Sequence, residues 1–261
     1  MSKIAILSDI HSNLPALEAV LKDVQASGVG RIVFLGDIVG YGASPAECVD
    51  WVRKLGGECV MGNHDAAIKQ VRRRGRQAMG AGWEKSGYAA GLVHSAESLG
   101  GERASWLERL PFTLEIPGAI AAHANLHLPE YFDYITDAES AAPTLRKIMT
   151  ESHMTGFFGH THMQEVFPDP CGEIQWLDDM RFHLPADVPC AVMVGSVGQP
   201  RHETDRLATW VLWDPDERVV EFRKTEYNRL QAAQDIAKAG LPLESALRLL
   251  TNEEAAFLMG K

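Results

Sequence analysis

The stretch IAILSDIHSNLPALEAVLKDV, residues 4–24, contains the unit from which the fold can be predicted. Ile4 to Leu7 is a short apolar run with the length of a buried strand. Apolar residues then recur at helical spacing from Leu14 to Val24, and Gly28 stands where helices commonly end. A strand, a polar loop and a helix in this order are typical of a parallel sheet with crossover helices.

The same order of elements recurs further along the chain. A second apolar run covers Ile32 to Leu35, and the spacing of Ser44 and Glu47 predicts a capping box at the start of a second helix. Pro45 suits the first turn of that helix. We expect a third strand at residues 58–61, followed by a helical insertion over the sheet at about residues 66–110.

Short apolar runs later in the chain predict a second sheet, packed on the first with helices outside. The expected strands cover residues 113–116, 120–122, 156–158, 165–167, 173–177, 191–194, 208–212 and 219–223. Helical spacing returns in a tail at about residues 230–261. Because no segment resembles a linker, we predict one domain over residues 1–261.

The composition excludes several classes of protein. With 46% hydrophobic and 23% charged residues, the chain is an ordinary globular protein, and its net charge of -10 makes a nucleic acid a poor partner. No apolar stretch approaches the roughly 18 residues of a membrane span, and no signal peptide is recognisable, so we expect a cytoplasmic protein. Four scattered cysteines without a CxxC pair are expected to be reduced thiols: Cys48, Cys59, Cys171 and Cys190.

Polar side chains follow the ends of five predicted strands. These ends are where open α/β sheets bind ligands. Singly, each residue has an ordinary explanation: Asp9 could cap a helix, and a lone His123 is more often a core histidine. Their convergence on one edge instead predicts a metal site. The residues are Asp9, His11, Asp37, Asn63, His64, Asp65, His123, His160 and His162.

In their order, these motifs resemble the signature of the calcineurin-like metallophosphoesterases. The match comprises D-x-H at residues 9–11, G-D-x-x-G at 36–40, G-N-H-D at 62–65, a histidine at 123 and G-H-x-H at 159–162. The segment GSVGQPR, residues 195–201, resembles the prokaryotic phosphodiesterase-like branch. The resemblance implies a four-layer α/β/β/α sandwich of two mixed β-sheets flanked by helices. The sequence departs from the family pattern at Ala124, where many relatives have glycine, and the loop 126–134 that follows is variable in the family. These differences affect the substrate assignment more than the metal site.

The resemblance also implies two divalent metal ions. One ion would bind Asp9, His11, Asp37 and His162, and the other Asp37, Asn63, His123 and His160, so that Asp37 bridges them. Such a mixed oxygen and imidazole set suits Mn²⁺, Fe, Zn²⁺ or Ni²⁺, with manganese favoured. A hydroxide held between the ions would attack phosphorus without a protein nucleophile.

A proton donor for the leaving group is the remaining requirement. His64 is expected to be this general acid, with Asp65 orienting its imidazole and raising its pKa; the alternative is a structural residue at a strand end. Asn13, Tyr41 and Arg201 are candidates for contact with the substrate. An N-cap asparagine, a turn tyrosine and a surface arginine are their alternatives.

The implied activity is metal-dependent hydrolysis of a small phosphodiester, and of phosphomonoesters as a further class. Within the enzymes, a protein phosphatase, a nuclease and a dinucleoside polyphosphate hydrolase are alternatives. A non-catalytic metal- or nucleotide-binding scaffold is an alternative of a different class. Against a scaffold, every ligand position and the candidate acid are present. A homo-oligomer is expected only from the frequency of such assemblies.

Overall fold

The computed structural model describes residues 2–169, 172–201 and 205–258. The first sheet has the order β2-β1-β10-β11-β8-β7, and the second has the order β3-β4-β5-β9-β6. The strands of the first sheet are β1 (Ile4–Leu7), β2 (Arg31–Phe34), β7 (Gln175–Trp176), β8 (Arg181–His183), β10 (Ala208–Asp214) and β11 (Val219–Thr225). Those of the second are β3 (Thr113–Ile116), β4 (Ala119–Ala122), β5 (Thr155–Phe158), β6 (Gln164–Pro168) and β9 (Cys190–Val194).

Both sheets are mixed. β1 and β2 run parallel, and β10 pairs antiparallel with β1. In the second sheet β4, β5 and β9 are parallel, and the edge strands β3 and β6 are antiparallel to their neighbours. The parallel strands of each sheet carry the polar loops predicted from the sequence, so these loops emerge at the carboxyl ends of β1, β2, β4 and β5.

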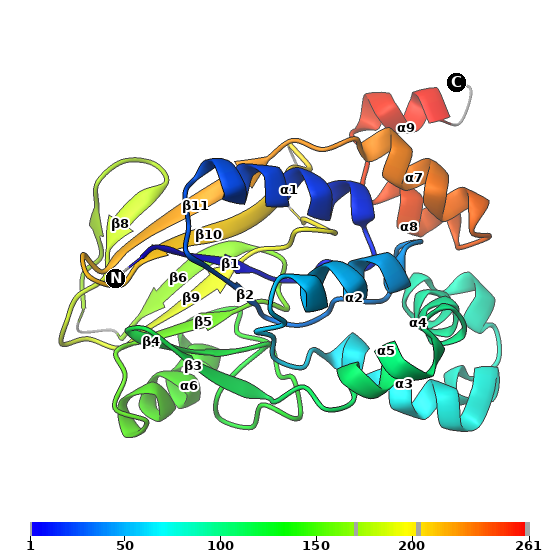
Figure 1. The fold of residues 1–261 in the computed structure, drawn as a ribbon. Helices are drawn as coiled ribbons and strands as arrows, with labels where there is room; N and C mark the ends of the chain where they lie inside the picture. The colour runs from blue at the N-terminus through cyan, green and yellow to red at the C-terminus, as the bar shows by residue number, and fades with distance from the viewer. Residues whose placement is uncertain (1, 170–171, 202–204, 259–261) are drawn as a thin grey trace.

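Alternation along each strand produces the layers. Ile4 and Ile6 of β1 belong to the core between the two sheets, whereas Ala5 and Leu7 belong to the core beneath the outer helices. In the second sheet Ala119 and Ala121 face the first sheet, and Ile120 packs outward against α6. The expected sandwich of two mixed sheets between helices is confirmed (Figure 1).

The helices cover the two outer faces and one end of the sandwich. They are α1 (Leu14–Ala26), α2 (Pro45–Lys54), α3 (Asn63–Arg74), α4 (Gly87–Ser98), α5 (Gly100–Leu107), α6 (Ala138–Thr150), α7 (Arg229–Lys238), α8 (Leu243–Leu247) and α9 (Asn252–Leu258), with 3-10 helices η1 (Gly75–Met79) and η2 (Trp83–Lys85). Helices α3 to α5 and α7 to α9 lie beyond the carboxyl end of β1 (Figure 1). None of the helices in the described segments is long and apolar enough to cross a membrane.

Several local predictions were wrong. The strands β10 and β11, expected in the second sheet, belong to the first, where β10 pairs with β1. Ser44 precedes α2, but its side chain makes no capping hydrogen bond. Helix α6 was not expected; Asp137 caps it in a capping box with Ser140, and Pro143 lies inside it. The strand expected at residues 58–61 is reduced to one bridge between Phe34 and Cys59. The strand expected at residues 173–177 is limited to the two residues of β7, and β8 follows where no strand was expected.

Candidate metal centre

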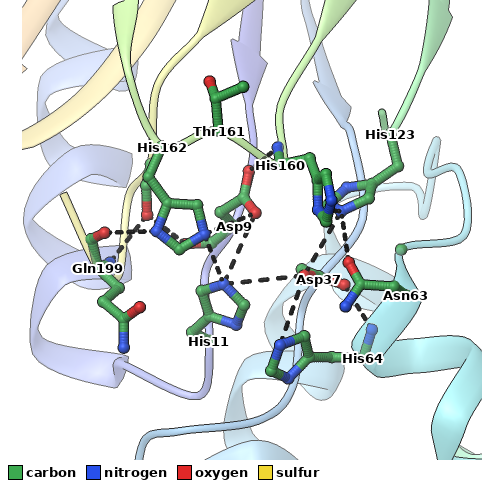
Figure 2. A network of polar contacts seen from close by, with 12 residues as sticks. Asp9, His11, Asp37, Asn63, His64, His123, His160, Thr161, His162 and Gln199 are labelled. Carbon is green, nitrogen blue, oxygen red and sulfur yellow. Dashed lines mark hydrogen bonds and ion pairs between the residues drawn. The ribbon is translucent and has the colours of Figure 1, made fainter. Parts of the chain in front are cut away.

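Apart from Asp65, the residues predicted at the strand ends meet in one cluster, in which Asn63 is half-buried and the others are buried (Figure 2). The loops after β1 and β2 run side by side, because the N–H of Asp9 donates to the carbonyl of Gly36 at 3.1 Å and that of His11 to Asp37 at 2.9 Å. Five of the predicted ligands have left-handed backbone, with φ between 48° and 65°: Asp9, His11, Asp37, His160 and His162. Such a conformation costs a non-glycine residue of order 1–3 kcal/mol, and its concentration here marks a functional site.

Asp9, His11 and His162 form the first group of the cluster. His11 Nε2 lies 3.1 Å from His162 Nε2, and Asp9 Oδ1 lies 3.2 Å from His162 Nε2. The Nδ1 atoms of the two histidines contact backbone carbonyls of Val39 and Gln199, at 3.2 and 2.6 Å. A carbonyl can only accept, so each Nδ1 carries the proton and each Nε2 presents a lone pair to the centre.

Asp37, Asn63, His123 and His160 form the second group. His123 Nε2 lies 3.4 Å from Asp37 Oδ2, 3.1 Å from Asn63 Oδ1 and 3.2 Å from His160 Nδ1. His123 Nδ1 donates to the carbonyl of Leu35 at 2.6 Å. Asp37 Oδ2 also lies 3.8 Å from His11 Nε2, so Asp37 stands between the two groups (Figure 2).

Each aspartate uses one oxygen to fix its position and directs the other into the cluster. Asp9 Oδ2 accepts the backbone N–H of His160 at 2.9 Å, and Asp37 Oδ1 accepts that of His64 at 2.8 Å. Asp9 Oδ1 is buried and accepts no hydrogen bond. A buried carboxylate oxygen beside imidazole lone pairs lacks a positive partner, and a divalent ion provides one.

The charges of the cluster are strongly coupled. Burial would raise the pKa of Asp9, but His162 and His11 hold it well below its usual value. Burial would lower the pKa of His123, but the adjacent Asp37 carboxylate raises it to about 9. Burial and the proximity of His123 lower the pKa of His160 to about 4. Neutral imidazoles beside ionised carboxylates are the form in which these residues bind metals.

The donor set fits two divalent ions. Asp9, His11 and His162 place their ligand atoms within 4.8 Å of one another, and so do Asp37, His123 and His160. A third such set combines His11 and Asp37 with His64, which was expected to be an acid rather than a ligand. Carboxylate and imidazole donors together suit Mn²⁺, Fe, Zn²⁺ or Ni²⁺.

The expected role of Asp65 was wrong. Its carboxylate accepts backbone N–H groups of Ile38, Val39 and Gly62, at 3.1, 3.4 and 3.2 Å, so it caps α3 and holds the loop after β2. His64 Nδ1 has no hydrogen-bond partner, and burial lowers the pKa of His64 to about 3. Both residues lie in the first turn of α3, where successive side chains point in different directions.

Other groups hold the imidazole of His64. Its Nε2 lies 3.9 Å from Asp37 Oδ2. The rings of Tyr41 and Tyr88 lie 4.7 and 4.8 Å from its ring centre. Gly40, with a φ of 93°, leaves no room for a Cβ beside His64 Nδ1. His64 is therefore packed in place by its neighbours and directs Nε2 toward Asp37.

The three candidates for substrate contact differ in their surroundings. Asn13 is the N-cap of α1, which is the alternative role considered for it. Its amide also donates to the carbonyl of Gly198 at 2.8 Å. Tyr41 packs edge-on against His11 at 4.9 Å. Arg201 is exposed and donates to the carbonyl of Thr161 at 3.3 Å. Burial raises the pKa of Tyr41 and Arg201 opposes the rise, which places Arg201 within electrostatic reach.

Further residues around the site were not predicted. Ser196 Oγ donates to the carbonyl of Asp9 at 2.9 Å and accepts the N–H of Gln199 at 2.8 Å. Tyr134 stacks on His160 with ring centres 3.9 Å apart. Ser196 and Gln199 lie in the segment 195–201, which carried a resemblance and could have indicated them. No sequence signal singles out Tyr134, because it lies in an irregular loop.

Comparison with known proteins places this geometry among related chains. Residues 2–218 match the family model of the calcineurin-like phosphoesterase superfamily domain. The chain is 33% identical over 250 residues to the uncharacterized protein MJ0912 of Methanocaldococcus jannaschii, across 92% of this chain and 94% of that protein. A metallophosphoesterase from Sphaerobacter thermophilus has a TM-score of 0.75 at 30% identity, over 95% and 98% of the two chains. Hypothetical protein PH1004 from Pyrococcus horikoshii OT3 shares the fold, with a TM-score of 0.73 at 21% identity over 96% and 98%.

Proposed function

The chain belongs to the calcineurin-like phosphoesterase superfamily, and on this premise we propose that it hydrolyses phosphodiester bonds with two divalent metal ions, manganese favoured. The observation that carries the proposal is the position of Asp37. Its Oδ2 lies 3.8 Å from His11 Nε2 and 3.4 Å from His123 Nε2, between the two groups of candidate ligands. A carboxylate in this position suits a bridge between two ions.

The protein residues would hold the reacting groups in fixed positions. When bound, two such ions would neutralise phosphate charge and lower the pKa of the attacking water. Asp9 and Asp37 cannot rotate freely, because a backbone N–H holds one oxygen of each. Arg201 is exposed, and its charge opposes the rise in the pKa of Tyr41, so it would attract an anionic substrate.

His64 is proposed to supply the proton for the leaving group. Its imidazole is neutral in the metal-free protein, because burial lowers its pKa to about 3. An anionic phosphate close to Nε2 would raise this pKa and so favour the protonated form. The proton would then pass from Nε2 to the leaving oxygen.

The alternative of a non-catalytic scaffold accounts for less of the site. A scaffold has no use for a buried imidazole that contacts Asp37 and is packed between two tyrosine rings. Strained backbone at Asp9 and Asp37 is also typical of an active site. These features favour turnover.

The test compares a chromogenic diester with its monoester. Metal-stripped protein is resupplied separately with Mn²⁺, Ni²⁺, Zn²⁺ and Mg²⁺ and assayed on bis(p-nitrophenyl) phosphate and p-nitrophenyl phosphate. We expect metal-dependent release from the diester, and loss of that release in Asp37→Asn. Protein that holds two ions but turns over neither substrate would contradict the proposal and favour the scaffold.

A cytoplasmic location is also part of the proposal. Cys48, Cys59 and Cys190 are free and buried, and Cys171 lies outside the described residues. Free thiols persist in reducing compartments. Fractionation of cells that produce the protein would test this location.

A further inference from the structure

Two partly exposed tyrosine rings lie against different parts of the centre. Tyr88, at the start of α4, packs edge-on against His64 at 4.8 Å and is 39% exposed. Tyr134 stacks on His160 with ring centres 3.9 Å apart and planes at 24°, and is 48% exposed. His160 covers one face of the Tyr134 ring, so the exposed area lies on the other face and the ring edge.

The loop that carries Tyr134 is held in place by its own contacts. Asn125 is 5% exposed; its amide donates to the carbonyl of Asp133 at 3.1 Å and accepts the N–H of Leu128 at 2.9 Å. Phe132 packs edge-on against His123 at 5.8 Å. On the other side of Tyr134, Ile135 is buried in the core beneath α6. Because residues on both sides are anchored, the Tyr134 ring is presented to solvent in a defined position, as a preorganised binding surface requires.

Tyr88 and Tyr134 pack on two different histidines of the cluster, His64 and His160. Burial raises the pKa of Tyr88, and Asp37 and Tyr134 raise it further. Tyr88 lies on the His64 side and Tyr134 on the His160 side of Asp37. A phosphodiester bound at Asp37 has two organic groups, and each of them would meet one ring.

We propose that Tyr134 is a specificity-determining residue that stacks on a planar aromatic group of the diester, the group that stays on phosphorus. This inference rests on the proposed diesterase activity, because a monoester has no retained group. The leaving group belongs on the side of the proton donor His64, and therefore beside Tyr88. Stacking of a flat ring on an aromatic side chain is favourable and depends little on the substituents of the ring. Nucleobases stack on aromatic side chains in the same way. The substrate class is a phosphodiester with aryl or nucleobase-like groups.

The test keeps the leaving group constant and changes only the retained group. Phenyl, cyclohexyl and methyl esters of p-nitrophenyl phosphate all release p-nitrophenolate, and phenyl and cyclohexyl have similar size but only phenyl is flat. We expect kcat/KM of the unsubstituted enzyme to favour phenyl over cyclohexyl by about five- to tenfold. Tyr134→Leu should remove this preference, and Tyr134→Phe should retain it.

Tyr131→Leu is the matched control, since Tyr131 lies in the same loop and is 68% exposed. It should leave the ratio of phenyl to cyclohexyl rates unchanged. Metal content is measured for every variant, because Tyr134 also packs on His160. If Tyr134→Leu lowers all three rates equally, the residue only positions His160 and the inference is overturned. An unsubstituted enzyme that hydrolyses the diesters without preferring phenyl overturns it too, whereas failure to hydrolyse any of them rejects the diesterase proposal itself.

Discussion

His64 can be interpreted either as a metal ligand or as the general acid. Its Nε2 lies 3.9 Å from Asp37, close enough for it to be counted with His11 and Asp37 as a possible ligand set, yet it is proposed to be the acid. The variant His64→Ala separates the two. As an acid, His64 should be dispensable for metal binding, and its loss should lower kcat by roughly 10²–10⁴-fold. Metal analysis beside kcat decides, since a variant that binds one ion fewer would identify His64 as a ligand.

Gly40 sets the position of that imidazole. It has a φ of 93°, and a Cβ there would overlap His64 Nδ1, so Gly40→Ala should displace the ring and lower kcat by roughly 10²-fold. Gly56→Ala is the matched control, because Gly56 has a φ of 106° and open space around it. Both variants should lose about 1–2 kcal/mol of stability from the left-handed backbone, as denaturant unfolding would measure. Equal kcat values for the two variants would contradict the role of Gly40.

The raised pKa of His123 predicts that metal binding is coupled to pH. Without metal, burial would lower the pKa of His123, but Asp37 raises it to about 9. The charged imidazole therefore stabilises the fold fully at pH values below about 6.5, the ordinary pKa of histidine. This stabilisation is lost as the pH rises through 9. A metal ion requires the neutral form. Metal uptake at pH 7.5 should therefore release about one proton from His123, and fewer at pH 9.5. Calorimetric titrations in two buffers of different ionisation enthalpy would measure it; identical heats would contradict it.

At the scale of elements, the sequence predicted what depends on short-range pattern. Strand β1, helix α1 and strand β2 follow from apolar periodicity, and the strand-end positions of Asp9 and Asp37 follow from them. Helix α6 was missed although Asp137 and Ser140 form a capping box, because Pro143 argues against a helix interior. The segment 58–61 makes only one bridge, since the N–H of Met61 donates to the carbonyl of Pro111 instead.

Side-chain partners were less predictable than positions. Asp65 follows His64 in the sequence, but the first turn of α3 directs its carboxylate to three backbone N–H groups. The stacking of Tyr134 on His160 depends on how the loop after β4 folds back, which no periodic pattern encodes. Contacts of this kind arise from tertiary packing, and only the folded chain shows them.

The loop after β9 makes hydrogen bonds to two members of the first group of candidate ligands, Asp9 and His162. Ser196 Oγ donates to the carbonyl of Asp9, and the carbonyl of Gln199 holds Nδ1 of His162. Ser196→Ala should weaken metal binding by about 10–100-fold, as loss of an outer hydrogen bond to a ligand commonly does. Ser27→Ala, which removes a hydrogen bond at the end of α1, should leave the metal affinity unchanged. Competition with a chromogenic chelator measures the metal affinity of both variants. Equal affinities for Ser196→Ala and Ser27→Ala would refute the supporting role of Ser196.

At the scale of the whole molecule, the site lies where the two sheets are joined. Asp9 follows β1 of the first sheet, and its Oδ2 accepts the N–H of His160, which follows β5 of the second. His11 and His162 make the same connection through their Nε2 atoms, 3.1 Å apart. Without a cation these contacts place carboxylates and imidazole lone pairs close together. Metal ions would thus link the sheets as well as serve catalysis.

This link predicts that metal loading stabilises the folded chain. At a free-metal concentration 100 times the Kd, binding adds about 2.7 kcal/mol. That free energy corresponds to roughly 5–10 °C in Tm for a chain of this size. The measurement is calorimetric unfolding of chelator-treated and Mn²⁺-loaded protein. Asp9→Asn keeps an acceptor for the N–H of His160 but removes the charge that faces the centre. It should therefore fold without metal and gain much less Tm from Mn²⁺, whereas a gain equal to that of the unsubstituted protein would show that the stabilising ion binds elsewhere.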